Sequence, residues 1–131
     1  MLFAALLLAV QTAPQCAATD AALPAKLAGW TTPADSFGPG KAVVLDARDG
    51  AVMIGFKIEA AGKYGVALDQ KGWIDVTPFG ADKPLESVEH GHGPDCSSIA
   101  KIVAFQLEPG VYTIKLSKLA QPKARLMLVA P

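Results

Sequence analysis

The sequence is poor in the residues and motifs that identify most common classes of protein. Its 131 residues include two cysteines and two histidines, and its 12 basic residues balance 12 acidic ones, so the formal net charge is zero. This balance argues against a nucleic-acid or anionic-membrane partner. The chain contains no Gly-x-Ser-x-Gly elbow, phosphate-binding loop or dinucleotide fingerprint. The length suits one domain and excludes a large multidomain enzyme.

Long hydrophobic runs are also missing, with one short exception at the N-terminus. Leu2–Val10 is an unbroken apolar stretch of nine residues, far below the roughly 20 that span a bilayer. Its length and the small residues after it are typical of a secretory signal peptide. We therefore predict a signal peptide at 1–18 and a periplasmic or secreted protein with no transmembrane segment. The cleavage site stays open, because a cut before Cys16 is an alternative to one after Ala18.

The two cysteines have two possible fates. If cleavage precedes Cys16, an exported protein can form one disulfide between Cys16 and Cys96, which closes a loop of about 80 residues and is worth roughly 4 kcal/mol in the chain-entropy model. If cleavage follows Ala18, Cys96 has no partner in the chain and becomes a thiol or a metal ligand.

The remaining chain predicts an all-β domain. It has 12 glycines and 10 prolines, too many breakers for a helical bundle, and it is 51% hydrophobic, which is too apolar for disorder. Apolar residues alternate with a period of two in short runs bounded by Gly or Pro. We predict a single antiparallel β-sandwich or jelly-roll-like domain over 19–131, with strands around 42–45, 52–58, 64–68, 74–76, 103–107, 112–116 and 125–129.

Two hairpins share a Gly-x-Tyr pattern. Tyr64 and Tyr112 each stand two residues after a turn glycine, at the start of a strand. In β-sandwiches such a tyrosine often covers the turn and bonds the backbone through its hydroxyl. We therefore predict structural roles for both tyrosines.

One loop gathers most of the chemistry-bearing residues. It runs from Glu89 to Ser98 and contains both histidines of the chain, His90 and His92. Imidazole is a common ligand of Zn and Cu, and a thiolate or carboxylate can complete a site. The sequence thus suggests a transition-metal site whose candidate ligands are His90, His92, Cys96, Asp95 and Glu89. A Cys16–Cys96 disulfide competes with this set, because it would remove the Cys96 thiolate.

The two tryptophans suggest a second kind of site. Trp30 and Trp73 can stack on a ligand if their rings are exposed. Trp73 shares a strand face with Asp75 and Thr77, which is compatible with partial exposure, but burial is the commoner fate of a tryptophan and is the expectation for both residues. No residue is assigned a catalytic role.

Part of the sequence is similar to a known group of proteins. The segment from His90 reads His-Gly-His-Gly-Pro-x-Cys-Ser-x-Ile-x-Lys, and the segment from Phe105 reads Phe-x-Leu-x-Pro-Gly-x-Tyr-x-Ile-x-Leu-Ser. With Leu23–Trp30, they resemble short exported proteins of alphaproteobacteria. Members are sometimes labelled homogentisate 1,2-dioxygenase, a larger cupin enzyme that holds iron with two histidines and a glutamate from separated positions. The resemblance implies export and a shared loop, and no particular mechanism.

Three functional hypotheses follow. The first is an exported small binding domain that takes a metal ion, such as Zn or Cu, or a small molecule through the His90–Cys96 loop. The second is a metal-dependent oxygenase or hydrolase that uses the same loop. The third is a structural or protein-interaction domain of the cell envelope. The sequence leaves the oligomeric state open.

Overall fold

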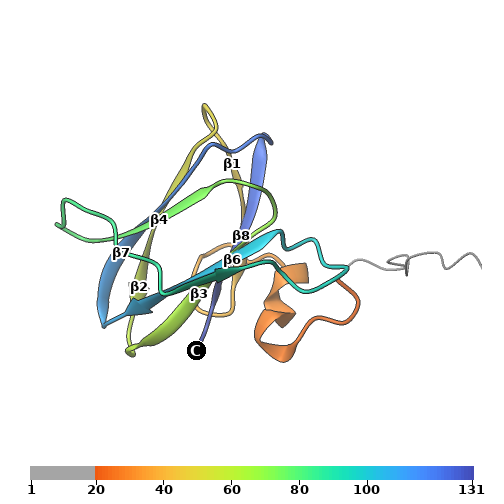
Figure 1. The fold of residues 1–131 in the computed structure, drawn as a ribbon, viewed down its shortest axis with the longest axis horizontal. Helices are drawn as coiled ribbons and strands as arrows, with labels where there is room; N and C mark the ends of the chain where they lie inside the picture. The colour runs from red at the N-terminus through yellow and green to blue at the C-terminus, as the bar shows by residue number, and fades with distance from the viewer. Residues whose placement is uncertain (1–19) are drawn as a thin grey trace, which may run out of the picture.

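The structure, a computed structural model, describes residues 20–131, and the predicted signal peptide therefore lies outside the described residues. It consists of one 3₁₀ helix followed by eight strands (Figure 1). Their bounds are η1 (Ala25–Thr31), β1 (Ala42–Asp46), β2 (Val52–Ile58), β3 (Gly62–Leu68), β4 (Trp73–Pro78), β5 (Glu89–Gly91), β6 (Lys101–Leu107), β7 (Gly110–Ser117) and β8 (Lys123–Val129).

The strands form two antiparallel sheets that face each other as a sandwich. One sheet has the order β1-β8-β3-β6-β5 and the other the order β2-β7-β4. The predicted all-β sandwich is confirmed. The predicted strand at 125–129 lies within β8, an interior strand that pairs with β1 on one side and with β3 on the other.

The core between the sheets follows from the period-two patterns. Inward residues of the five-stranded sheet, such as Phe105 and Leu126, pack with inward residues of the three-stranded sheet, such as Ile114 and Leu116. All four are at most 2% exposed. Because every second residue of a strand points to the same face, the other face of each sheet is left for other contacts.

The outer face of the five-stranded sheet is partly covered by η1. Leu27 and Trp30 of this helix are buried against Ala67 of β3 and Met127 of β8, forming a second apolar cluster. Pro24 precedes the helix at its N-cap, in keeping with the fixed φ of proline at helix starts.

The two Gly-x-Tyr hairpins are built alike, as predicted. Tyr64 Oη donates to the carbonyl of Ala60 at 2.7 Å, and Tyr112 Oη donates to the carbonyl of Glu108 at 2.7 Å. The hydroxyl of Tyr112 also accepts from the Glu108 N–H at 2.9 Å. Both rings are buried, so the two tyrosines hold turns.

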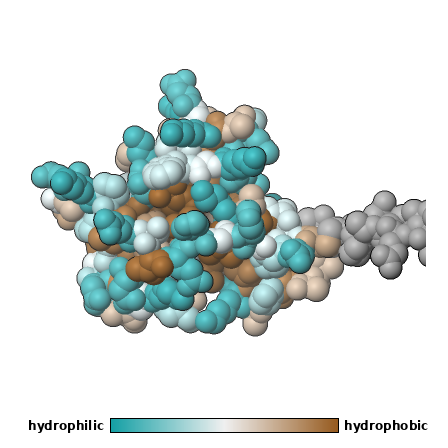
Figure 2. All heavy atoms as spheres, in the orientation of Figure 1, coloured by the Kyte–Doolittle hydropathy of each residue, from teal (hydrophilic) through white to brown (hydrophobic). Residues whose placement is uncertain are grey.

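On the face shown in Figure 2, apolar residues gather in the middle and hydrophilic side chains surround them. In the described part of the chain, no helix combines the length and apolarity needed to cross a membrane.

Candidate functional site

The histidine-containing loop begins as a short edge strand that the sequence did not predict. β5 pairs with β6 in the register Glu89↔Ala104, His90↔Val103 and Gly91↔Ile102. All three β5 residues are exposed. Three residues without alternating apolar side chains do not predict a strand. β5 forms because its backbone pairs with that of β6.

The first half of this loop does not assemble a metal centre. Glu89 forms an ion pair with Lys63, with Oε2 and Nζ 2.8 Å apart, and the hydrogen bond and charge of Lys63 lower the pKa of Glu89 below its ordinary value. Within residues 20–131, no group of three or more His, Cys, Asp and Glu side chains is arranged to hold a metal ion. The predicted metal site therefore stays a prediction without a preformed ligand cluster, and its candidate ligands are His90, His92, Cys96, Asp95 and Glu89.

The second half of the loop is fastened to the N-terminal arm. Asp20 accepts hydrogen bonds from the backbone N–H of Ser98 at 2.7 Å and from its hydroxyl at 2.6 Å. The N–H of Asp20 donates to the carbonyl of Cys96 at 3.4 Å. Cys96 adopts a positive φ of 62°, which is uncommon for a residue with a side chain. These bonds indicate that Cys96 and Ser98 have a structural role.

The predicted stacking role of Trp30 is not compatible with the structure. Its ring is 0% exposed, and its Nε1 donates to the Ser98 hydroxyl at 2.8 Å. Arg125 lies over the ring and donates from Nη1 to the Trp30 carbonyl at 2.9 Å. Sequence alone could not assign this position, because the covering partners come from β8 and from the loop after β5.

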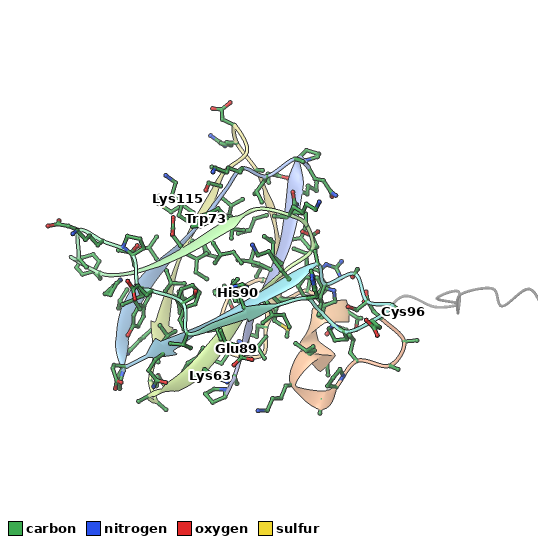
Figure 3. The ribbon with its side chains drawn as sticks, viewed as in Figure 1. Lys63, Trp73, Glu89, His90, Cys96 and Lys115 are labelled. Carbon is green, nitrogen blue, oxygen red and sulfur yellow. The ribbon has the colours of Figure 1, made fainter. Side chains whose placement is uncertain are left out.

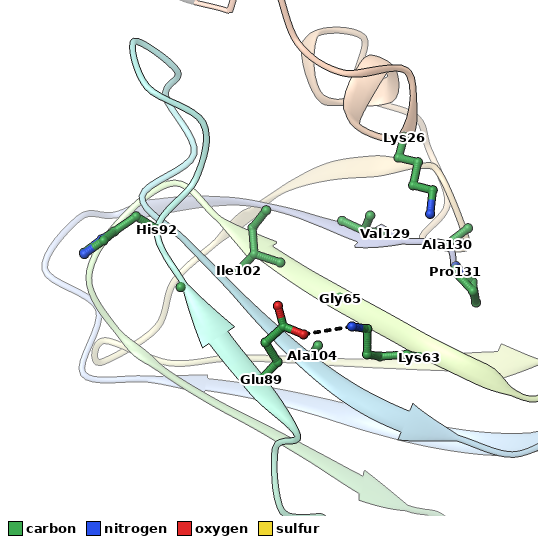
Figure 4. Close-up of a pocket in the computed structure, with 11 residues that line it drawn as sticks. Lys26, Lys63, Gly65, Glu89, His92, Ile102, Ala104, Val129, Ala130 and Pro131 are labelled. Carbon is green, nitrogen blue, oxygen red and sulfur yellow. Dashed lines mark hydrogen bonds and ion pairs between the residues drawn. The ribbon is translucent and has the colours of Figure 1, made fainter.

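A shallow groove lies beside η1 on the outer face of the five-stranded sheet (Figure 4). Its volume is about 410 Å³, and its floor is formed by small and apolar residues that include Gly65, Ile102 and Val129. The Lys63–Glu89 pair lies along one side, and His92 points away from the groove. The charges of Lys63 and Glu89 neutralise each other, and Lys26 supplies one further positive charge at the groove.

The outer face of the three-stranded sheet carries the strongest candidate site. We call it the Trp73 face. It is defined by the outward side chains of β2, β7 and β4 and by Phe79, which follows β4. The register aligns Met53 with Lys115 and Lys115 with Asp75 in one row across the sheet. The next row aligns Gly55, Thr113 and Thr77. The full set is Met53, Gly55 and Lys57 of β2, Val111, Thr113 and Lys115 of β7, and Trp73, Asp75, Thr77 and Phe79 on or after β4.

The exposed apolar residues of the protein are concentrated on the Trp73 face. Trp73 is 57% exposed and Phe79 is 83% exposed. Of the six large hydrophobic residues that are exposed in residues 20–131, four belong to this face, namely Met53, Trp73, Phe79 and Val111. Single exposed apolar side chains are normal, but their grouping on one surface is typical of a binding site.

The Trp73 ring is exposed and still held in place. Its Nε1 donates to Oδ1 of Asp75 at 3.0 Å, and Nζ of Lys118 lies 5.8 Å from the ring centroid. Figure 3 shows Trp73 and Lys115 on the same side of the sandwich. A hollow of about 380 Å³ lies over the row of Met53, Lys115 and Asp75, and all three side chains line it. The aromatic ring, fixed by Asp75, thus lies on the same face as a hollow lined by both apolar and polar side chains.

Sequence reasoning identified Trp73 and its neighbours Asp75 and Thr77, but it missed Lys115, Met53 and Phe79. Two observations together identify them, namely the alternation of side chains along a strand and the pairing of neighbouring strands. Lys115, for example, faces outward because it lies between the buried Ile114 and Leu116. Alternation alone does not show which strands are neighbours, and the β2-β7-β4 order was needed to join these residues.

Comparison with models of known protein families and with curated proteins finds no match to this chain.

Proposed function

We propose that the protein is an exported, non-catalytic binding domain that binds a carbohydrate on the Trp73 face. The observation that carries the proposal is the exposed Trp73 ring, fixed by Asp75 and flanked by polar side chains. A sugar ring has apolar C–H groups on its faces and hydroxyls at its rim. It therefore suits a flat aromatic ring bordered by hydrogen-bonding groups.

The polar residues of the Trp73 face match the rim of a sugar. Asp75 accepts hydrogen bonds, Lys115 donates them, and the hydroxyls of Thr77 and Thr113 do both. These side chains lie on strands whose register is fixed. Binding therefore requires little further loss of conformational entropy from the protein.

Binding is favoured over hydrolysis on this face. Glycoside hydrolysis commonly uses a pair of carboxyl groups on either side of the scissile bond. Asp75 is the one carboxylate among the outward side chains that define the Trp73 face, and one of its oxygens already accepts from the Trp73 indole. A second acid at the required position is missing from this set.

Export is part of the proposal and rests on the apolar run Leu2–Val10. A disulfide between Cys16 and Cys96 would suit an exported protein. The hydrogen bond from the Asp20 N–H to the Cys96 carbonyl supports the pairing, because it brings the chain four residues after Cys16 to the backbone of Cys96. No free cysteine occurs among residues 20–131.

We expect Trp73→Ala to weaken carbohydrate binding at least tenfold. Loss of an apolar side chain buried by a ligand removes about 1.5–3 kcal/mol, and each 1.4 kcal/mol is a factor of about ten in affinity. The measurement is calorimetric titration of the mature protein with soluble oligomers of xylose, glucose, N-acetylglucosamine and galacturonic acid.

Two variants serve as controls. Trp73→Phe retains an aromatic ring and should keep part of the affinity. Val44→Ala removes an exposed apolar residue from β1 of the other sheet and should bind like the wild type. The proposal fails if none of these oligomers binds, or if Trp73→Ala binds them as tightly as the wild type does.

A further inference from the structure

The Trp73 face has an excess of positive charge in a protein whose formal net charge is zero. Lys57 and Lys115 both point outward from it, and Lys118 lies at the Trp73 ring. Two carboxylates oppose these three lysines, namely Asp75, which accepts the indole hydrogen bond, and the exposed Glu59, two residues after Lys57 and directly after the end of β2. The two ion pairs found among residues 20–131 are Lys63–Glu89 and Lys123–Asp46, so neither Lys57 nor Lys115 is paired with a carboxylate in this part of the chain.

The positions of the lysines fit a ligand that extends along β4. Trp73 and Phe79 are six residues apart on one edge of the face, which corresponds to roughly 20 Å at the rise of an extended strand. Lys115 lies between them, because it is aligned with Asp75 of β4. The row of Gly55, Thr113 and Thr77 carries only small side chains and leaves the surface low next to Lys115. A chain of several sugar units can therefore contact the Trp73 ring and the Lys115 ammonium together.

On the basis of the proposed function, we infer that the carbohydrate is an acidic oligosaccharide. Its sugar ring stacks on Trp73, and its carboxylate or sulfate groups bind Lys115 and Lys57. The lysine ammonium is a compact charge with three donors, so it recognises the negative charge without selecting between these two acidic groups. Opposite charges on an exposed surface attract weakly, but several contacts in one ligand add up and become dependent on salt.

The test uses matched probes in which the carboxylates are either free or masked as methyl esters. Oligogalacturonate and its fully methyl-esterified form have the same sugar units, and a sulfated galactan oligomer tests the alternative acidic group. We expect the wild type to bind oligogalacturonate at least tenfold more tightly than the ester. The affinity for the acid should fall when the salt concentration rises from about 20 to about 200 mM, because this change shortens the Debye length about threefold. The affinity for the uncharged ester should stay the same.

Lys115→Gln and Lys26→Gln form a matched pair of variants. Each removes one exposed positive charge, but Lys26 borders the groove on the other sheet. We expect Lys115→Gln to bind oligogalacturonate about three- to tenfold more weakly, which is the loss expected for one typical hydrogen bond at an exposed site. Lys26→Gln should bind like the wild type.

The outcomes separate this inference from the proposed function. If the acid and the ester bind equally and Trp73→Ala weakens both, the carbohydrate site stands and the inference of an acidic ligand is overturned. If Trp73→Ala has no effect on any oligomer, the proposed function itself fails. A weaker complex with Lys26→Gln would place the ligand in the groove and overturn the inference. Equal affinity for an oligothymidylate of the same charge would also overturn it, because it would show polyanion binding without sugar recognition.

Discussion

Replacing Trp30 by alanine should lower the free energy of unfolding by about 3–5 kcal/mol, as loss of a large buried aromatic side chain does. The ring is fully buried beneath η1 and contributes to the cluster that covers the outer face of the five-stranded sheet. The change also removes the indole donor to the Ser98 hydroxyl and the ring beneath Arg125. Small domains have about 5–15 kcal/mol of stability, so this loss is a large part of the total and the variant should unfold at a clearly lower urea concentration than the wild type. Urea unfolding followed by circular dichroism measures the effect.

The other tryptophan provides the control. Trp73→Ala removes the same side chain from an exposed position, where substitutions usually change stability by less than about 0.5 kcal/mol. The two variants should therefore have opposite phenotypes, with Trp30→Ala unstable and Trp73→Ala stable but defective in binding. Equal unfolding midpoints for the two variants would contradict the packing of η1 against the sheet.

Reduction of the proposed Cys16–Cys96 disulfide should produce the second large loss of stability. The chain-entropy model gives roughly 4 kcal/mol for a closed loop of about 80 residues. The loop would join the N-terminal arm to the segment that Asp20 already fastens through Cys96 and Ser98. Urea unfolding of the mature protein with and without dithiothreitol measures the difference.

The double variant Cys16→Ser/Cys96→Ser is the matched control for reduction. It should have the stability of the reduced wild type and should not respond to dithiothreitol. Two titratable thiols in the mature, non-reduced protein would contradict the disulfide. An intact mass that starts after Cys16 would contradict it as well, because the partner would then be removed with the signal peptide.

The strands could be predicted from the sequence because their physics is local. In β2, Val52, Phe56 and Ile58 are buried, while Met53 and Lys57 are exposed. This alternation is visible in the sequence as a period of two. The same local logic predicted Tyr64 and Tyr112 at the hairpins. β5 has no such signal, since its exposed residues are held only by the neighbouring backbone of β6.

The site depends on long-range pairing and was predicted only in part. Exposure of Trp73 follows from its alternation with the buried Ile74. The burial of Trp30 does not follow from its neighbours in sequence, because Arg125 and Ser98 reach it from distant segments. Lys115 becomes part of the site because β7 lies between β2 and β4. A pattern within one strand contains no information about that order.

The measurement that tests the central claim most directly is an NMR titration that observes the two tryptophan indole N–H signals. The chain has two tryptophans, and the structure gives them opposite environments, with Trp73 exposed and Trp30 buried. Titration of the mature protein with oligogalacturonate should shift the Trp73 indole signal, which reports on the bond to Asp75, and leave the Trp30 signal in place. A Trp73 signal that does not move at saturating ligand, or that moves only together with Trp30, would contradict a binding site on the Trp73 face.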